Sequence, residues 1–394
     1  MLRVLVVGAG TMGHGIAQVA AMAGYYVYLY DVSAEALNNA MSKIRWSLEK
    51  LKEKGAIGSV EAVLSRIVTV KNLEEGARDA DLAIEAVTED ISIKREVFRF
   101  LDRTMRPDAI IATNTSSLPI SEIAAAVSRP QRVLGLHFFN PPVLMKLVEV
   151  VKGDSTDNEA LKKALDFVKS LGKTPILVKR DVPGFIVNRI LHAVFNIACH
   201  LVNRGVYSVL EVDSALKYRV GLPMGIFELR DFSGIDVGYM VAKSLAERDV
   251  LFSQLCPLLE KLYREGRLGI KSGEGFYKYV AAQKPFIPKE AGDKVDVVTL
   301  LAPGVNMAAW LIRNEVASKE DIDMGVKLGL GYPRGILEMA DEWGVDQVLE
   351  RLNRLYLREG LILARPDPLI VEMVRRGELG KKTGKGFYDY ESQG

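Results

Sequence analysis

Short, continuous apolar runs alternate with longer amphipathic segments along the first half of the chain. The apolar runs occupy residues 2–7, 26–30, 67–70, 81–87, 109–113 and 132–139. A strand that is buried on both faces of a parallel sheet has this continuous apolar pattern. The segment 34–55 has helical periodicity, and another helix is expected from about residue 94. Strands that alternate with helices predict an α/β domain with a doubly wound sheet.

The first apolar run leads directly into a glycine-rich turn, GAGTMG, at residues 8–13. The candidate cofactor-binding residues in it are Gly8, Gly10, Thr11, Met12 and Gly13. The first glycine permits a tight turn, the second lets the backbone approach a pyrophosphate, and the third lets helix and strand pack closely. The N–H groups at the start of the following helix are free to bind an anion. The turn therefore predicts a Rossmann-type dinucleotide site, although glycine turns without ligands also occur.

Asp31 ends the second apolar run, 18 residues after the third glycine. An acidic residue at this distance is the context that supports the dinucleotide interpretation. Its carboxylate can accept hydrogen bonds from a ribose 2′-OH and would repel a 2′-phosphate. The sequence therefore favours NAD over NADP as cofactor.

The segment HFFNPPVLMKLVEV contains one of only four histidines, His137, and a glutamate, Glu149, inside an apolar run. A carboxylate is costly to bury unless it is paired. A turn through the NPP segment could return Glu149 beside the imidazole, where it would fix the tautomer and stabilise the imidazolium. Oxidation of a secondary alcohol needs such a base, because the hydroxyl proton must leave as hydride moves. The alternative is a buried histidine with a purely structural role.

The NTSS segment, residues 114–117, follows another expected strand. Ligands of doubly wound sheets bind beyond the carboxyl ends of the strands, where this segment should lie. Ser116 could cap a helix that begins near Pro119, or it could donate a hydrogen bond to a substrate oxygen. The sequence does not separate these two roles.

The second half of the chain has helical periodicity and an internal repeat. Eight acidic, glycine and proline positions recur at an offset of 110: Asp213, Gly221, Pro223, Gly225, Glu228, Asp231, Gly234 and Asp236 return as Asp323, Gly331, Pro333, Gly335, Glu338, Asp341, Gly344 and Asp346. GIKSGEGFYKY also returns as GKKTGKGFYDY. We therefore expect a nucleotide-binding domain at 1–182 and two tandem all-α domains at 183–292 and 293–394.

Composition narrows the function further. Lys and Arg total 52 against 50 for Asp and Glu, which gives no electrostatic reason to expect a nucleic acid or membrane partner. The two cysteines exclude a disulfide framework and favour a reducing cytoplasm. His192 and His200 are interpreted as packing residues, and no metal site is expected.

Six motifs in this order, GAGTMGHGIAQ, IEAVTED, NTSSLPI, HFFNPP, MKLVEVV and DVPGFIVNRI, resemble the L-3-hydroxyacyl-CoA dehydrogenase family, and the resemblance covers essentially the whole chain. It implies reversible, NAD-dependent oxidation of (S)-3-hydroxyacyl-CoA to 3-oxoacyl-CoA in the metabolism of fatty acids and short-chain acyl-CoAs. It also implies that His137 is the catalytic base, that Glu149 is its partner, and that Ser116 and Asn188 contact the reacting oxygens.

The same resemblance implies further contacts. Cofactor contacts would come from Glu89, Lys94, Asn140 and Lys271, and coenzyme A contacts from Ser47 and Lys54. Two alternatives remain, a dehydrogenase of a free hydroxy or sugar acid and a non-catalytic NAD-binding protein like some lens crystallins. Coenzyme A affinity would distinguish the first, and the presence of all four catalytic candidates argues against the second.

Many members of this family carry the C-terminal helical domain once and use it to dimerise. We therefore expect the second copy to pack on the first with pseudo-two-fold symmetry, as a partner subunit would. The chain would then be a monomer with an internal pseudo-dimer, or a homodimer. The position 110 residues after Asn188 is Val298, so the second copy is expected to be structural.

Overall fold

The computed structural model describes residues 2–280 and 283–390. The chain forms two compact units, Met1–Phe185 and Ile186–Gly394. The first is the sheet unit and the second the helical unit. The division between them falls close to the domain boundary expected at 182/183. Both predicted helical domains lie in one unit, so the boundary expected between them at 292/293 stays a prediction.

The sheet unit contains one eight-stranded sheet with the order β3-β2-β1-β4-β5-β6-β7-β8. Its strands are β1 Arg3–Val7, β2 Tyr26–Tyr30, β3 Ile67–Val70, β4 Leu82–Glu85, β5 Ile110–Thr113, β6 Val133–Phe138, β7 Leu147–Lys152 and β8 Thr174–Val178. All neighbouring strands are parallel except β6 and β7, which are antiparallel. The Rossmann-type class predicted from the alternating pattern is confirmed.

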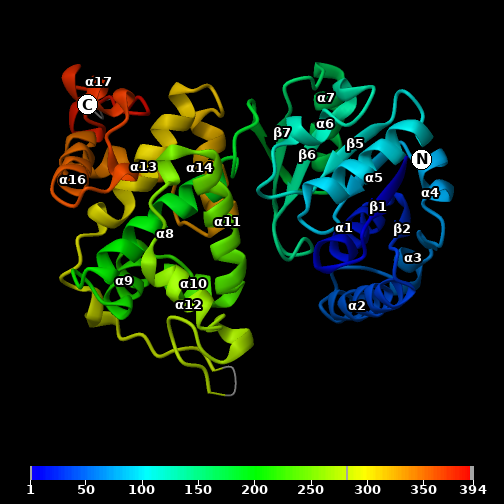
Figure 1. Ribbon diagram of the computed structural model, residues 1–394, viewed down its shortest axis with the longest axis horizontal. Helices are drawn as coiled ribbons and strands as arrows, with labels where there is room; N and C mark the ends of the chain where they lie inside the picture. The colour runs from blue at the N-terminus through cyan, green and yellow to red at the C-terminus, as the bar shows by residue number, and fades with distance from the viewer. Residues whose placement is uncertain (1, 281–282, 391–394) are drawn as a thin grey trace. The chain divides into compact units, whose positions relative to one another are not determined.

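Helices cover both faces of this sheet (Figure 1). They are α1 Thr11–Met22, α2 Ala34–Glu53, α3 Val60–Leu64, α4 Leu73–Asp79, α5 Ile91–Thr104, α6 Ile120–Ala124 and α7 Asn158–Ser170. Alternate residues of a strand point to opposite faces. Val4 and Val6 belong to a core shared with α1, α2, α3 and α7, while Leu5 lies against Gly76 of α4 on the other face.

Helix α5 begins at Ile91, three residues before the start expected near Lys94. The Asp90 side chain accepts hydrogen bonds from the backbone N–H groups of Ser92 (2.8 Å) and Ile93 (3.2 Å). An N-cap of this kind satisfies donors that the helix itself leaves unpaired. The cap therefore extends the helix upstream of its apolar periodicity.

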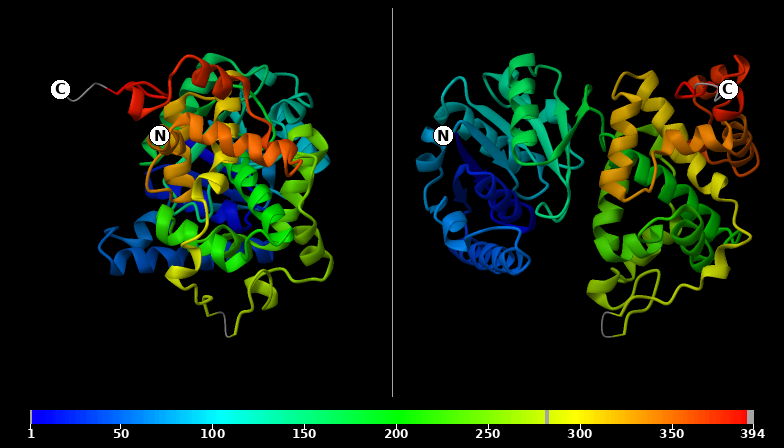
Figure 2. Two further views of the ribbon diagram at one scale, coloured as in Figure 1. Left: turned by 90° about the vertical axis from the view of Figure 1, so that its left-hand side faces the viewer. Right: turned by 180° about the vertical axis from the view of Figure 1, so that it is seen from behind.

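The helical unit contains α8 Val187–Asn203, α9 Val209–Ser214, α10 Ile226–Ser233, α11 Ile235–Arg248, α12 Pro257–Arg264, α13 Val297–Arg313, α14 Lys319–Leu330, α15 Ile336–Trp343, α16 Val345–Leu357 and α17 Pro368–Arg375. We call residues 187–279 copy 1 and residues 297–390 copy 2. Figure 2 shows copy 1 in green and copy 2 in yellow to red. The class of two tandem all-α repeats after a Rossmann-type sheet is confirmed.

The repeated acidic residues make the same contacts in both copies. Asp231 accepts hydrogen bonds from the backbone of Phe276 and Tyr277 and from the Tyr279 hydroxyl, all at 2.9 Å. Asp341 binds its own copy's equivalents, Phe387, Tyr388 and Tyr390, at 2.8 to 3.0 Å. These carboxylates hold the chain end of each copy against its third helix, α10 or α15.

The two copies meet through equivalent residues. A Cβ on Gly221 would lie 3.5 Å from Pro333, and a Cβ on Gly331 would lie 2.8 Å from Pro223. Residues 221 and 331, like 223 and 333, are related by the offset of 110. A contact in which i meets j and the equivalent of j meets the equivalent of i is the mark of a two-fold interface. The copies therefore pack with the pseudo-two-fold symmetry expected from the repeat.

The sequence analysis did not anticipate that the two cysteines pair with each other. Cys199 of α8 and Cys256, the residue before α12, form a disulfide across a sequence separation of 57 residues. Two cysteines so far apart give no signal of pairing in the sequence. Because α12 packs against α8, the Cα atoms of Cys199 and Cys256 lie 6.0 Å apart, which is within the range of a disulfide.

Among the residues that the structure describes, no helix is long and apolar enough to cross a membrane. The same residues contain no group of three or more His, Cys, Asp or Glu side chains that could hold a metal ion.

Candidate active site

His137 and Glu149 face each other across two strands. They are directly paired in the antiparallel register of β6 and β7, with His137 Nδ1 2.6 Å from Glu149 Oε2. His137 is 6% exposed and Glu149 is fully buried. Within the described residues, Nε2 of His137 forms no hydrogen bond to protein. One ring nitrogen is thus held by a carboxylate, and the other is available for a proton.

Two aromatic rings flank the imidazole. The ring centroid of Phe139 lies 4.7 Å from that of His137, and the centroid of Phe185 lies 5.8 Å from it. Such contacts restrict the tilt of the imidazole. The sequence reasoning had not assigned either ring to the site.

The NTSS segment lies beside the dyad. Asn114 Oδ1 accepts a hydrogen bond from the backbone N–H of Phe138 (2.9 Å), which ties this segment to the end of β6. Ser116 is half-buried. It does not cap the nearby helix, because α6 begins after Pro119 without any side-chain cap. The capping alternative is therefore wrong, and the substrate contact stays a prediction.

Glu89 organises this segment. Its carboxylate accepts hydrogen bonds from the Ser117 hydroxyl (3.0 Å), the Ser116 N–H (3.2 Å) and the Thr115 hydroxyl. Burial alone would raise the pKa of Glu89, but the charge of Lys94 and these hydrogen bonds outweigh burial and hold the pKa below its usual range. Glu89 therefore stays ionised and positions Ser116, whether or not it also touches the cofactor.

Lys94 is only 1% exposed. Its Nζ lies 2.7 Å from Glu85 Oε1 and 3.2 Å from Glu89 Oε2. Glu85 also accepts a hydrogen bond from the Thr113 hydroxyl at 2.7 Å. Lys94 thus pairs with one carboxylate at the end of β4 and with another in the loop between β4 and α5, and the cofactor contact expected for it stays a prediction. Sequence reasoning missed Glu85, although a glutamate inside an apolar run is the signal that identified Glu149.

The side chain of Lys173 holds the loop that carries Asn140. Lys173 Nζ donates hydrogen bonds to the carbonyl oxygens of Pro142 and Met145, both at 2.5 Å. Burial lowers the pKa of Lys173 to about 8. Asn140 itself is exposed, so its amide is accessible to a ligand.

The glycine turn has the shape that a dinucleotide requires. A Cβ on Gly8, whose φ is +105°, would lie 2.5 Å from the Ala86 carbonyl oxygen, and one on Gly13 would lie 1.8 Å from that of Gly8. A Cβ on Gly10 would meet nothing within 4 Å. The first and third glycines are therefore required by packing, whereas the second leaves open space. Thr11 and Met12 form the first turn of α1, whose N-terminus has no side-chain cap or acidic residue, so its N–H groups fit a pyrophosphate.

Asp31 joins this turn to β2. Its two carboxylate oxygens accept hydrogen bonds from the backbone N–H groups of Ala9 (2.8 Å) and Ser33 (2.9 Å). A carboxylate has about four acceptor positions, so it retains capacity for a ribose hydroxyl.

The residues expected to contact coenzyme A lie at the end of α2. Ser47 Oγ accepts a hydrogen bond from Gln18 of α1 at 2.9 Å, and Lys54 directly follows α2 and is exposed. Ser47 keeps its hydroxyl proton available, and Lys54 can reach a phosphate. Both contacts stay predictions.

The two remaining candidates belong to the helical unit. Asn188 lies in the first turn of α8. Lys271 Nζ lies 2.5 Å from Asp236 Oδ1, and the equivalent pair in copy 2, Lys382 and Asp346, is also formed at 2.5 Å. Since the pair occurs in both copies, it stabilises the repeat, and a cofactor role for Lys271 stays a prediction.

Comparison with known proteins places the chain in a family. Residues 3–182 match the NAD-binding domain of 3-hydroxyacyl-CoA dehydrogenase, and residues 184–279 and 297–390 match its C-terminal domain. The chain belongs to the 3-hydroxyacyl-CoA dehydrogenase family. It is therefore an NAD-dependent oxidoreductase, as the glycine turn and the resemblance predicted.

Individual relatives agree with this assignment. A probable 3-hydroxybutyryl-CoA dehydrogenase of Bacillus subtilis is 43% identical over 286 residues, which cover 70% of this chain and 97% of the relative. The human mitochondrial hydroxyacyl-coenzyme A dehydrogenase is 42% identical over 286 residues, or 70% of this chain and 91% of that protein. These relatives leave part of this chain without a counterpart.

A solved structure resembles nearly the entire chain. The crystal structure of 3-hydroxybutyryl-CoA dehydrogenase from Escherichia coli K12 has a TM-score of 0.87 at 28% identity, and the match covers 95% of this chain and 99% of that one. The arrangement of a sheet unit followed by doubled helices is thus shared with another family member.

Proposed function

We propose that this chain catalyses the reversible oxidation of (S)-3-hydroxyacyl-CoA to 3-oxoacyl-CoA. The observation that carries the proposal is the 2.6 Å contact between His137 Nδ1 and Glu149 Oε2 at the carboxyl end of β6. A base held in one tautomer, on a sheet that also carries a dinucleotide turn, suits the removal of a hydroxyl proton during hydride transfer. NAD, when bound, accepts the hydride.

The residues divide the work as follows. His137 takes the proton of the 3-hydroxyl group on Nε2, and Glu149 holds Nδ1–H and stabilises the imidazolium that forms. Ser116, which Glu89 positions, donates a hydrogen bond to the reacting oxygen. Asn188 orients the thioester. Stabilising charge that develops only during the reaction lowers the barrier without tightening substrate binding.

The cofactor would be held by Gly8, Gly10, Thr11, Met12 and Gly13 through their backbone, and by Asp31 at the ribose. Asn140 would lie near the nicotinamide. The open space beside Gly10 supports this placement, because a side chain there would occupy the position of the pyrophosphate.

Substitution of the base tests the mechanism. We expect His137→Gln to lower kcat by about 10²- to 10⁴-fold, the usual contribution of a general base, with little change in NAD affinity. NADH formation with (S)-3-hydroxyacyl-CoAs of four to sixteen carbons gives kcat, and quenching of protein fluorescence gives the NAD affinity. Unchanged kcat would show that His137 is a structural histidine.

The same assay separates the alternatives. A dehydrogenase of free hydroxy or sugar acids would produce NADH without the coenzyme A group, and a non-catalytic NAD-binding protein would produce none with either substrate. The relatives named 3-hydroxybutyryl-CoA and hydroxyacyl-coenzyme A dehydrogenase favour the acyl-CoA reaction over a free acid. The contact between His137 and Glu149 favours a catalytic over a non-catalytic protein.

We also propose that the chain works without a partner copy and that copy 2 takes the place of a second subunit. The reciprocal approaches of Gly221 to Pro333 and of Gly331 to Pro223 support this proposal. Solution mass by light scattering should correspond to one chain. An obligate dimer through the helical units would contradict this proposal. Cytoplasmic localisation stays a prediction, and the disulfide removes one of the arguments that supported it.

A further inference from the structure

Three arginine side chains are buried in the described part of the chain, and one of them lacks a counter-ion. Arg132 is paired with Asp102 at 2.8 Å, and Arg189 with Asp249 at 2.6 Å. Arg230 of α10 is 6% exposed, yet no described residue forms an ion pair or a side-chain hydrogen bond with it, and its Nε is without an acceptor. An unpaired buried charge is strongly destabilising, so this arginine requires an explanation.

The surroundings of Arg230 compensate its charge only in part. The guanidinium carbon lies 4.5 Å from the centre of the Phe195 ring, a favourable cation–π contact. The side chain also lies across Gly238, where a Cβ would come within 2.3 Å of Nη1. The neighbouring Asp231 is committed to Phe276, Tyr277 and Tyr279. These contacts supply no counter-ion, and the buried Nε of Arg230 is left without an acceptor.

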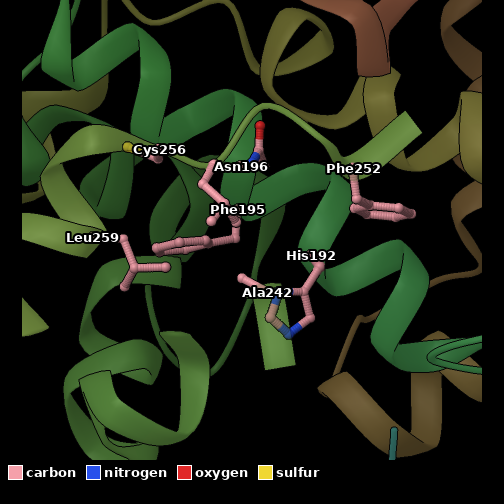
Figure 3. A pocket seen from close by; sticks show the side chains of 8 residues that line it. His192, Phe195, Asn196, Ala242, Phe252, Cys256 and Leu259 are labelled. Carbon is pink, nitrogen blue, oxygen red and sulfur yellow. The ribbon is translucent and has the colours of Figure 1, made fainter. Parts of the chain in front are cut away.

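A second polar group next to Arg230 is also without a partner. His192 of α8 is 4% exposed, and no hydrogen bond joins its ring to another of the described residues. Its pKa is held well below the usual value by burial and by the charge of Arg230. His192 and Phe195 line the same small cavity, together with Asn196, Phe252 and Leu259 (Figure 3).

Copy 2 provides an internal comparison. At the offset of 110, Arg230 corresponds to Ala340 and His192 to Ala302. The repeat therefore folds without either polar group, and copy 1 has both of them. Two costly groups that occur together and are both replaced by alanine in the equivalent scaffold indicate a shared ligand rather than a requirement of the fold.

We propose that copy 1 contains a binding site for a small oxyanion, a carboxylate or a phosphate, in which Arg230 supplies the charge and His192 a further hydrogen bond. The planar guanidinium fork matches two oxygens of such an anion. Gly238 lies in the first turn of α11, so the N-terminus of that helix also favours negative charge near the guanidinium. The bound anion completes the core of copy 1. Neither Arg230 nor His192 belongs to the residues assigned to the dehydrogenase reaction.

Thermal unfolding of the full chain tests the site. We expect sodium formate or sodium phosphate, added at constant ionic strength, to raise Tm by several degrees and to saturate at millimolar concentration. In Arg230→Leu this dependence should disappear, while Tm without the anion should equal or exceed that of the wild type. Arg264→Leu removes an exposed arginine of the same copy and should keep the full response.

The outcomes are distinct. A response that is equal in the wild type and Arg230→Leu, or the absence of any saturable response, would overturn the site. A response as large with sodium chloride as with formate and phosphate would overturn its assignment to an oxyanion. His192→Ala, which installs the residue of copy 2, should weaken formate binding several-fold. If Arg230→Leu does not fold, calorimetric titration of the wild type with formate decides the question, and no measurable binding refutes the proposal.

Discussion

Copy 1 and copy 2 are built on the same scaffold, but copy 1 has three polar residues, Asn188, His192 and Arg230, at positions where copy 2 has apolar ones. Both copies have the carboxylate that binds two backbone N–H groups and a tyrosine, at Asp231 and Asp341. Copy 1 alone has Asn188 in its first helix, where copy 2 has Val298. Residues that occur in both copies serve the fold, whereas a polar residue that occurs in one copy either stabilises that copy by its own means or has another role.

The two copies also use different interactions to connect the first helix of the copy to its last helix, α8 to α12 in copy 1 and α13 to α17 in copy 2. In copy 1 the start of α12 is joined to α8 by the Cys199–Cys256 disulfide. In copy 2 the equivalent of Cys256 is Asp367, which caps α17 and binds Arg313 of α13 at 2.9 to 3.1 Å. A covalent link and a charged pair thus hold the same two elements together.

Reduction of the disulfide should have the largest effect on this comparison. A link that closes a loop of about 57 residues stabilises the fold by about 4 kcal/mol in the chain-entropy account. We expect the double variant Cys199→Ser, Cys256→Ser to lose most of this stabilisation, as measured by guanidinium unfolding. Addition of a reductant should lower the stability of the wild type by the same amount. Asp367→Asn should cost less, about 1 to 3 kcal/mol.

A transplant checks that the joints are interchangeable. Asn203 is the position in copy 1 that corresponds to Arg313. The triple variant Cys199→Ala, Cys256→Asp, Asn203→Arg should recover part of the stability that the serine variant loses. If it is no more stable than the serine variant, the two joints are not equivalent.

Asn188 should give the clearest difference in activity. Loss of one group that orients the reacting oxygens lowers turnover by about 10²-fold, so Asn188→Ala should reduce kcat to this extent. Val298→Ala, the matched change in copy 2, should leave kcat within about two-fold and affect only stability. Equal activity of the two variants would remove Asn188 from the catalytic set.

The pH dependence of stability should differ between the copies by a smaller amount. Burial raises the pKa of Asp213 to about 7 and that of Asp323 to about 6. A carboxyl group whose folded pKa lies above its unfolded value, about 3.9, binds more protons when folded. Its contribution to stability is therefore complete below pH 4 and is lost as pH rises through the folded pKa.

Urea unfolding between pH 5 and 8 measures this slope. Asp213→Asn should remove the part nearest pH 7, and Asp323→Asn the part nearest pH 6, each amounting to at least about 1 kcal/mol. A slope that is the same in the wild type and both variants would assign the titration to other groups.

The smallest effect is expected at the repeated lysines. Lys271 and Lys382 are about half exposed, at 49% and 45%, and each is paired with an aspartate. Exposed pairs contribute about 0.2 to 1 kcal/mol, so Lys271→Met and Lys382→Met should lower stability by equally little. A rise in the KM for NAD that is confined to Lys271→Met would establish the cofactor contact, and identical KM values would exclude it.

Local patterns identified much of the sheet unit. The glycine turn, Asp31 and the apolar runs are short-range signals, because each depends on residues that are neighbours in the chain or lie on consecutive elements. The dyad belongs to the same class, since His137 and Glu149 are 12 residues apart on adjacent antiparallel strands. A hairpin register can be anticipated from the alternation of side chains along its strands.

The internal repeat likewise allowed the fold of the helical unit to be predicted from the sequence. An offset of 110 that recurs at acidic, glycine and proline positions implied two equivalent folds, and the paired contacts of Gly221 with Pro333 and Gly331 with Pro223 agree with their symmetric packing. The offset also revealed which positions had diverged.

Only the tertiary structure decided the features that depend on distant side chains. The carboxylates around Lys94, the disulfide between α8 and α12, and the isolation of Arg230 beside His192 arise where elements far apart in sequence are packed together. The order of residues alone determined the fold class, the repeat and the cofactor turn, because period and spacing encode them directly. Whether a buried charge finds a partner depends on where several separate elements place their side chains, which no local pattern specifies.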